Sequence, residues 1–350
     1  MERDRAMSPV EPRVLDLPMP EPGARHYVSP GIGWVRHPLP FALDHVNCWV
    51  LDDTDDIEAP PAPVGEDTLI IDTGIAAPRT RELWEAVLAG RAPGRLLVTH
   101  FHPDHMGLAG EFSRGGTAVL GSAIETALSR RIHAVADADY GFADWYAAHG
   151  LPATVVAAAR AFGNGYRKIV AEPPSAEAWQ HLVAGDTLAI GTRRYGVLIG
   201  PGHAPDMVML HDAASGILIA ADQVLPTISP NISIMPLTDD PDPLASFLAS
   251  LEALRALPVD TLVLPSHGRP FRGLHARLDA LAVHHVERLA ALEEATGEWV
   301  TAFELFPVLY RRELDAQQLS FALGETLAHL AHDGRFERRE SAGVVRWRRV

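Results

Sequence analysis

The sequence predicts an α/β fold in which two β-sheets pack face to face between helices, followed by a smaller C-terminal domain. Three observations lead to this prediction. From about Gly31 onward, short apolar runs alternate with turns and helical patterns, in the order strands, helices, strands, helix, strand. After about Gly273 the pattern changes to amphipathic segments and a hairpin. With 350 residues, the chain is long enough for about two domains.

The first half of the chain begins with a proline-punctuated lead-in, residues 1–30, which we expect to be loose. Strands are predicted at 34–40, 45–53 and 68–74, and the acidic, proline-rich stretch 52–67 is predicted to be a surface loop. Apolar residues at helical spacing predict a helix at 78–90, and the run 95–100 is a buried strand ending at His100. Residues 122–170 are mostly helical in pattern.

The second half returns to strands at 186–191, 193–200, 208–212 and 216–222, with a helix at 243–256 and a last strand at 261–267. Helices are then predicted at 275–296, 299–310 and 314–333, and the final residues form a hairpin around Ser341-Ala342-Gly343. We therefore expect a lead-in (1–30), a larger domain (31–275) with a helical cap at about 122–170, and a C-terminal domain (276–350).

Composition excludes several classes of protein. The chain carries 30 Lys plus Arg and 45 Asp plus Glu, a net charge of −15, which argues against a main role in binding nucleic acid or anionic membranes. No apolar run is long enough to span a bilayer, and the start has no signal-peptide pattern. The single cysteine, Cys48, excludes an internal disulfide and a thiolate zinc cluster. We expect a soluble, cytoplasmic protein.

Histidines and carboxylates cluster directly after the strand that ends at His100. His100, His102, Asp104 and His105 lie within six residues, and a loop there can direct the first two one way and the last two the other. A single histidine would be an ordinary loop residue, but four such groups in one turn favour a metal site. The spacing suits two neighbouring ions.

Three further candidate ligands follow apolar runs later in the chain. They are His203 in IGPGHAPD, Asp222 in LIAADQV and His267 in LVLPSHG. Residues at strand ends on one edge of a sheet converge on one site. Asp186, in VAGDTLAIG, precedes the PGH segment, and we interpret it as a turn residue at a strand start.

These positions resemble those of the metallo-β-lactamase-fold hydrolases. The HxHxDH signature of that family corresponds to residues 100–105, and its later ligands match His203, Asp222 and His267 in order and context. LIIDTG, ending around Asp72, and the PGH before the fourth ligand are further family features. The resemblance covers about residues 30–275 and implies an αββα sandwich.

The resemblance also implies a ligand set for two divalent metal ions. His100, His102 and His203 would hold one ion, and Asp104, His105 and His267 the other. Asp222 would bridge both, so Asp104 and Asp222 are the carboxylates expected in the catalytic machinery. Zn²⁺ is our expectation, and Fe or Mn also suits nitrogen and carboxylate ligands. A metal-bridging hydroxide would be the nucleophile. Asp72 could orient a ligand histidine or be a plain turn residue.

The substrate is less constrained than the chemistry. A bridging carboxylate is the pattern of glyoxalase-II-like thioesterases, phosphodiesterases and nucleases, so we expect a hydrolase of an ester, thioester or lactone with a small-molecule substrate. The first alternative is a phosphodiesterase or endoribonuclease acting on single-stranded RNA. The second is a non-catalytic metal-binding regulatory module. Candidate substrate-contacting residues are His45, Tyr166 and Lys168.

The C-terminal segment resembles the winged-helix module of the β-lactamase-like-2 type of protein, some members of which cleave RNA. From His275 onward, however, ten arginines and no lysine stand against twelve acidic residues, and only the last residues are basic. A nucleic-acid-binding module usually has a plainly basic face, so packing on the catalytic domain or in a homodimer is favoured over RNA binding.

Overall fold

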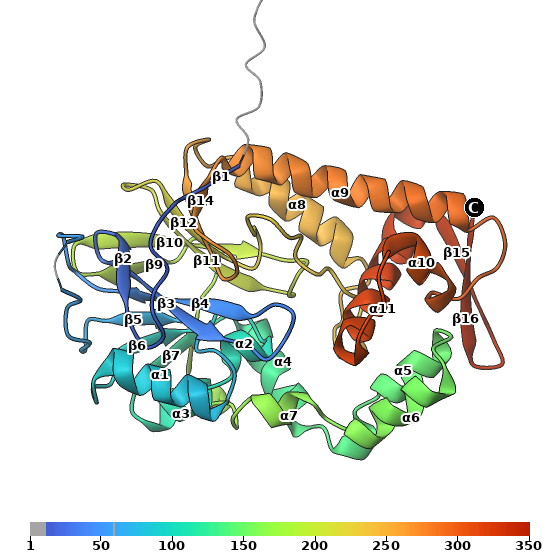
Figure 1. The fold of residues 1–350 in the computed structure, drawn as a ribbon, viewed down its shortest axis with the longest axis horizontal. Coiled ribbons are helices and arrows are strands. Elements are labelled where there is room, and N and C mark those ends of the chain that lie inside the picture. The colour runs from blue at the N-terminus through green and yellow to red at the C-terminus, as the bar shows by residue number, and fades with distance from the viewer. Residues whose placement is uncertain (1–11, 59) are drawn as a thin grey trace, which may run out of the picture.

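The computed structural model describes residues 12–58 and 60–350, and for residues 316 and 317 it describes the backbone alone. Two seven-stranded sheets form the larger part of the molecule (Figure 1). The N-terminal sheet consists, in spatial order, of β2 (His26–Ser29), β3 (Ile32–Pro38), β4 (His45–Leu51), β5 (Leu69–Ile71), β6 (Arg95–Leu97), β7 (Ala118–Gly121) and β8 (Trp179–His181). Its first four strands pair antiparallel, and β5 to β8 pair parallel.

The C-terminal sheet has one parallel pair in an otherwise antiparallel arrangement. Its strands, in spatial order, are β1 (Arg13–Val14), β14 (Phe271–Arg272), β13 (Leu262–Pro265), β12 (Ile217–Ala221), β11 (Met207–Asp212), β10 (Arg193–Gly200) and β9 (Thr187–Ile190). Strands β12 and β13 are parallel. Because the carboxyl ends of parallel strands lie at one edge of a sheet, β12 and β13 deliver the residues that follow them to the same place.

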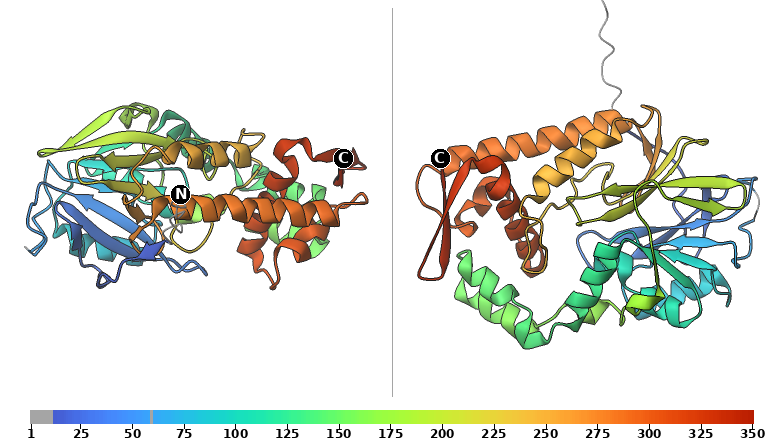
Figure 2. Two further views of the ribbon diagram at one scale, coloured as in Figure 1. Left: turned by 90° about the horizontal axis from the view of Figure 1, so that it is seen from above. Right: turned by 180° about the vertical axis from the view of Figure 1, so that it is seen from behind.

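Helices cover the outer faces of both sheets and extend beyond them (Figure 2). Those between β5 and β8 are α1 (Pro78–Leu88), α2 (Pro103–Met106), α3 (Ala109–Arg114), α4 (Ala123–Ala134), α5 (Phe142–Ala148), α6 (Ala153–Phe162) and α7 (Tyr166–Ile169). The later elements are α8 (Pro243–Leu254), α9 (Leu274–Ala295), α10 (Phe306–Leu309), α11 (Ala316–Ala331), β15 (Phe336–Ser341) and β16 (Val344–Arg349). Helix α9 runs from the C-terminal sheet to the β15–β16 hairpin (Figure 1).

The core between the sheets confirms the predicted αββα arrangement. Trp34, Trp49 and Leu97 of the N-terminal sheet pack in one buried cluster with Val197 and Leu210 of the C-terminal sheet. Trp49 packs in this cluster, while its neighbours Cys48 and Val50 pack in the separate cluster that includes the helices. Successive side chains of the strand therefore give the sheet two apolar faces.

A second large cluster joins the helices at the C-terminal end of the molecule. Leu278 of α9 and Leu323 of α11 share it with Tyr146 of α5 and with Trp347 of the hairpin. The helical segment that includes α5 and α6 lies between β7 and β8 in the chain, but it packs against the C-terminal helices.

The lead-in is more ordered than the sequence indicates. Residues 12–30 contain β1 and β2, which form the outermost strand of the C-terminal and N-terminal sheets respectively. Residues 1–11 of the expected lead-in lie outside the described residues. The expectation of a loose segment was thus wrong for 12–30, because very short edge strands carry too few residues to show a period-two pattern.

The helix expected at 299–310 is also shorter than predicted. The structure has a 3-10 turn at Phe303–Leu305 followed by the single-turn α10. Pro307 cannot donate a backbone hydrogen bond, which restricts it to the first turn of a helix. Within residues 12–58 and 60–350, no helix combines the length and apolarity that crossing a membrane requires.

Candidate metal centre

Loops at the ends of strands from both sheets bring the seven candidate ligands together. Four of them follow β6, with His100 and His102 in the loop and two more in the short helix α2. The β10–β11 loop carries His203, and Asp222 and His267 follow β12 and β13. Potential ligand atoms within 4.8 Å of one another form three overlapping groups. These are His100, His102 and His203; His100, His105 and Asp222; and Asp104, His105 and His267.

In the first group, nitrogen atoms of neighbouring imidazole rings point toward each other. Nε2 of His100 lies 3.0 Å from Nδ1 of His102. Burial and the neighbouring histidines lower the pKa of His100, and burial lowers that of His102 to about 3. Thr99 Oγ1 donates to Asp72, so it accepts from His100 Nδ1–H at 3.0 Å, and His100 Nε2 carries a lone pair. A cation between the two rings would satisfy both nitrogens.

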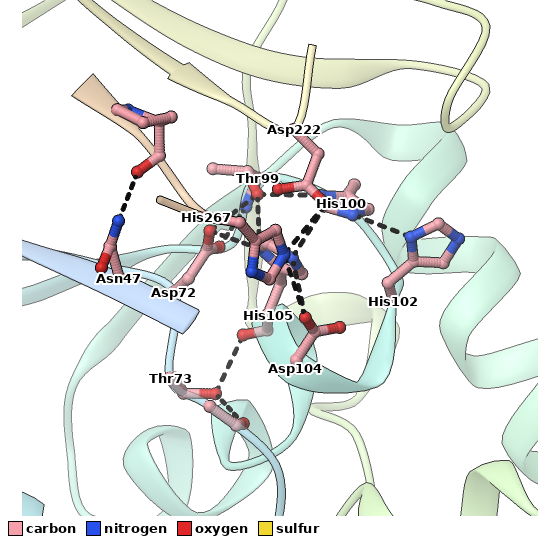
Figure 3. A network of polar contacts seen from close by, with 12 residues as sticks. Asn47, Asp72, Thr73, Thr99, His100, His102, Asp104, His105, Asp222 and His267 are labelled. Carbon is pink, nitrogen blue, oxygen red and sulfur yellow. Dashed lines mark hydrogen bonds and ion pairs between the residues drawn. The ribbon is translucent and has the colours of Figure 1, made fainter. Parts of the chain in front are cut away.

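The group of Asp104, His105 and His267 has two imidazoles with carboxylates on both sides. The rings of His105 and His267 lie between Asp104 and Asp222 (Figure 3), with His267 Nε2 3.4 Å from Asp104 Oδ2 and 3.3 Å from Asp222 Oδ2. Although burial alone would lower the pKa of His267, the two carboxylates raise it to about 10. Burial would raise the pKa of Asp104, but His105 and His267 hold it well below its usual range.

Asp222 contacts both groups. Its Oδ2 lies 3.3 Å from His203 Nε2 and 3.6 Å from His105 Nε2. Its other oxygen, Oδ1, is buried without a hydrogen bond to any described residue. The preceding residue, Ala221, has φ 47°, a left-handed conformation that costs a non-glycine residue energy and is often found at functional sites. This is the position expected of a bridging carboxylate, although ligation itself stays a prediction.

Oxygen acceptors outside the groups orient three of the histidines. His105 Nδ1 donates to Asp72 Oδ2 at 2.7 Å, and His203 Nδ1 donates to the backbone oxygen of Asn231 at 2.8 Å. His267 Nδ1 donates to the backbone oxygen of His45 at 2.7 Å. Of the two interpretations of Asp72, the structure supports the orienting one. The same carboxylate accepts from the Thr99 backbone N–H at 2.8 Å, and the backbone of Asp72 has a φ of 62°.

Sequence reasoning missed Glu125, a fully buried carboxyl group on α4. Its oxygens accept from the backbone N–H of Phe101 at 3.0 Å and of Asp206 at 2.6 Å, so it joins the loop of His100 and His102 to that of His203. Burial raises its pKa to about 8 although both N–H donors lower it. The pattern Ser122-x-x-Glu125 indicates only a helix-capping box, and Ser122 does cap α4. No local sequence pattern indicates that Glu125 also joins the two ligand-bearing loops.

The candidate substrate-contacting residues Tyr166 and Lys168 differ in exposure. Tyr166 is only 5% exposed, and its hydroxyl donates to the backbone oxygen of Phe101 at 2.6 Å. It supports the metal-binding loop, and a contact between this residue and a substrate stays a prediction. Lys168 is exposed, with Nζ donating to the Phe162 backbone oxygen at 2.7 Å. Its role at the site stays a prediction.

His45 is engaged on both ring nitrogens. Its Nδ1 donates to Asp44 Oδ1 at 2.5 Å, and its Nε2 accepts from the Gly268 backbone N–H at 2.8 Å. Together with its backbone bond to His267, this makes His45 a support of that ligand. Asp186 accepts from the Val183 backbone N–H at 2.9 Å in the turn before β9, as the interpretation of it as a turn residue requires.

The donor set fits divalent metals. Buried imidazole Nε2 of His203 and carboxylate Oδ1 of Asp222 both lack hydrogen bonds to the described residues, which leaves them available as ligands. Nitrogen and oxygen donors suit zinc, iron and manganese.

Comparisons with known proteins agree with this geometry. A family model for the Metallo-beta-lactamase superfamily matches residues 43–267, and one for the metallo-beta-lactamase-like C-terminal domain matches residues 289–350. The chain is 25% identical over 323 residues to a "probable metallo-hydrolase", YqjP, from Bacillus subtilis (strain 168), covering 85% of this chain and 90% of that protein.

Two solved structures are similar over nearly the whole chain. A beta-lactamase domain protein from Burkholderia ambifaria is 37% identical with a TM-score of 0.85, covering 97% of this chain and 98% of that one. A metallo-beta-lactamase family protein from Thermus thermophilus is 28% identical with a TM-score of 0.75, covering 91% of this chain and 99% of that one. With its fold, its cluster of histidines and aspartates and these matches, the chain belongs to the metallo-β-lactamase superfamily.

Proposed function

We propose that this protein is a binuclear metal-dependent hydrolase that cleaves an ester, thioester or lactone. The observation that carries the proposal is the position of Asp222, whose Oδ2 lies 3.3 Å from Nε2 of both His203 and His267. One carboxylate shared by two ligand groups suits a pair of ions better than a single one.

The residues would divide the work as follows. His100, His102 and His203 hold the first ion, Asp104, His105 and His267 the second, and Asp222 contacts both. When bound, two divalent cations, zinc in our proposal and iron or manganese as alternatives, supply a hydroxide nucleophile near neutral pH and polarise the substrate carbonyl. Most of these side chains are buried, which keeps bulk water from weakening the charge interactions.

The protein's own thiol is a poor candidate for an alternative nucleophile. Cys48 is fully buried, and burial raises the pKa of its thiol well above the usual range. A thiol attacks as the thiolate, so a raised pKa suppresses its reactivity.

The basic end of the chain supports a carbonyl substrate over RNA. Arg348 pairs with Glu337 at 2.5 Å, and Arg338 pairs with Glu340 at 2.9 Å. Arg339 and Arg348 lie over the ring of Trp299 at 4.3 and 4.8 Å from its centroid. Arginines already engaged within the hairpin contribute less to a phosphate-binding face.

The test compares hydrolysis of an acyl thioester and of single-stranded RNA by one metal-analysed preparation. We expect thioester turnover, reduced at least about 100-fold in Asp222→Ala because a shared ligand is lost. Far-UV circular dichroism should show an intact fold. Asp186→Ala, which removes a carboxylate from a turn outside the metal centre, is the matched control and should keep wild-type turnover.

Other results would contradict the proposal in distinct ways. RNA cleavage alone, with a steep salt dependence, would favour the nuclease. Two bound metals without turnover of either substrate would favour the non-catalytic module. Full activity of metal-stripped Asp222→Ala would exclude the metal mechanism altogether.

A further inference from the structure

A long loop begins at Asp222 and runs to α8, residues 222–242. Loops of this length without regular structure are uncommon inside compact domains and are often functional. The first part of this one is held firmly in place. Val224 and Ile232 are fully buried in the cluster formed by α8, α9 and α11, where they pack with residues such as Leu278 and Leu323.

Helix α9 binds the backbone of this loop through a half-buried cation. Arg277 Nε donates to the Leu225 backbone oxygen at 2.6 Å, and Nη2 donates to the Ile228 backbone oxygen at 2.7 Å. Two turns further along α9, His284 Nε2 lies 3.3 Å from Ser229 Oγ. Three successive parts of the loop are thus attached to one face of the helix.

Helix α11 holds the next part of the loop. Asn231 Nδ2 donates to the Phe321 backbone oxygen at 3.2 Å, and the Ile234 backbone N–H donates to the Gly324 backbone oxygen at 3.1 Å. The two backbones approach so closely that a Cβ on Gly324 would lie 2.6 Å from Ser233 Oγ. This glycine makes the contact between α11 and the loop possible.

Asn231 connects these attachments to the metal centre. Its side chain donates to α11, while its backbone oxygen accepts from His203 Nδ1 at 2.8 Å. A hydrogen bond at the far nitrogen of a ligand histidine sets both the tautomer and the orientation of the ring. The position of the Asn231 carbonyl therefore decides how His203 Nε2 faces the other ligands.

We infer that the C-terminal helices α9 and α11 position His203 for the first metal ion through this loop, with Asn231 as the positioning residue. The inference rests on the ligand assignment in the proposed function. It gives the C-terminal segment a role at the metal centre that requires neither nucleic acid nor a partner chain. Loss of any one attachment should leave the seven side chains present but relax the His203 ring.

The experiment uses the full chain and zinc as the probe. Arg277→Ala removes the two guanidinium bonds from α9 and leaves the contact of His284 with Ser229. Asn231→Ala removes the bond to α11 and the bond that Ser233 Oγ donates to Asn231 Oδ1, while it keeps the backbone carbonyl. Each variant should bind one of two zinc ions about 10- to 100-fold more weakly, the range for loss of groups that orient ligands, and keep the other. Zinc affinities would be measured by chelator competition, with bound zinc counted by metal analysis.

Arg255→Ala is the matched control. This arginine also reaches α9, through Asp279 at 2.5 Å, but it contacts the α8 residue Glu252 and not the loop. Both zinc affinities should equal those of the wild type. A difference in the control would mean that any loosening of α9 weakens the site, which would overturn the specific role of the loop.

Cobalt substitution separates positioning from simple destabilisation. The visible spectrum of bound Co²⁺ depends on ligand geometry, so it should change in Asn231→Ala even where the melting temperature of the metal-free protein does not. If Arg277→Ala does not fold, Asn231→Ala alone decides. Wild-type zinc affinities and an unchanged cobalt spectrum in a folded Asn231→Ala would overturn the inference. Absence of hydrolysis by the wild type would contradict only the proposed function, because none of these readouts uses a substrate.

Discussion

The proton on the outer nitrogen of each histidine determines which nitrogen faces the ions. His105, His203 and His267 each donate from Nδ1 to an oxygen, so Nε2 is the nitrogen available to a metal. The three acceptors come from Asp72, Asn231 and His45, which lie in different parts of the chain. Ring orientation is therefore set by the tertiary structure, and a histidine-rich loop alone would not produce it.

Metal loading should release protons. In the metal-free protein the pKa of His267 is about 10 and that of His105 is raised by Asp104 and Asp222, although burial opposes both shifts. These shifts favour the protonated rings near neutral pH, and both rings must lose a proton to bind through Nε2. We therefore expect the two histidines to release roughly two protons per chain, in addition to the proton lost when metal-bound water becomes hydroxide. The number should fall as the pH approaches 10, and metal affinity should rise with pH over the same range.

Calorimetric titrations of zinc into the metal-free protein, in buffers of different ionisation enthalpy, count these protons. A release of one proton or fewer at neutral pH would show that the two histidines are already neutral, because hydroxide formation alone accounts for one. That result would contradict the description of His105 and His267 as protonated by the charges of Asp104 and Asp222.

Tyr166 offers a test of support against substrate contact. Tyr166→Phe removes the hydroxyl that contacts the Phe101 backbone oxygen and Ser129 Oγ, so unfolding by denaturant should require about 1–2 kcal/mol less. KM for the thioester should stay at the wild-type value. A raised KM with unchanged stability would instead favour the substrate contact expected from the sequence.

At the scale of elements, α4 connects two of the loops that carry candidate ligands through hydrogen bonds to Glu125. Glu125 reaches backbone N–H groups on either side of the first ligand group, next to His100 and His102 at Phe101 and close to His203 at Asp206. Both oxygens of a carboxyl group have lone pairs and can accept these bonds, even in the neutral acid that a pKa of about 8 favours near pH 7, whereas an amide presents one oxygen and one NH₂ donor.

Glu125→Gln should therefore weaken the first metal site. The amide nitrogen would meet a backbone N–H, so we expect zinc affinity at one site to fall by about 10-fold or more while the second site is retained. Asp212→Asn is the control, because Asp212 also accepts two backbone N–H groups, those of Ala214 and Ser215, in a turn outside the centre. Wild-type zinc affinity in both variants would mean that the first metal site does not depend on the hydrogen bonds of Glu125.

The strands that carry ligands could be predicted because their apolar runs are bounded by turns. Strands β10 to β13 lie where those patterns place them. The two-residue strands β1 and β14 could not be predicted, because two residues show no periodicity and each strand pairs with a partner far along the chain. In the same way the spacing of residues 100–105 predicts ligands, whereas Glu125 and Asn231 act through contacts between distant segments that no local pattern encodes.

At the scale of the whole molecule, the metal centre joins the two sheets. Four candidate ligands follow β6 of the N-terminal sheet, and His203, Asp222 and His267 come from loops of the C-terminal sheet. Bound ions would therefore link both halves of the sandwich, with the C-terminal helices fastened to the same loops.

Metal removal should lower the stability of the entire fold. A ligand that binds only the native state at about 1,000 times its Kd adds about 4 kcal/mol to the free energy of unfolding. Scanning calorimetry with and without a chelator should show a lower melting temperature after chelation, and a smaller change in Asp222→Ala. An identical melting temperature with and without zinc would indicate that the two sheets are not linked by metal.

The central claim is that seven side chains form one catalytic centre for two ions. Stepwise addition of zinc to the metal-free protein, with thioester hydrolysis measured at each ratio, tests it most directly. We predict that bound zinc saturates at two ions per chain and that full turnover requires the second. Saturation at one ion per chain, or full turnover with none bound, would contradict the claim.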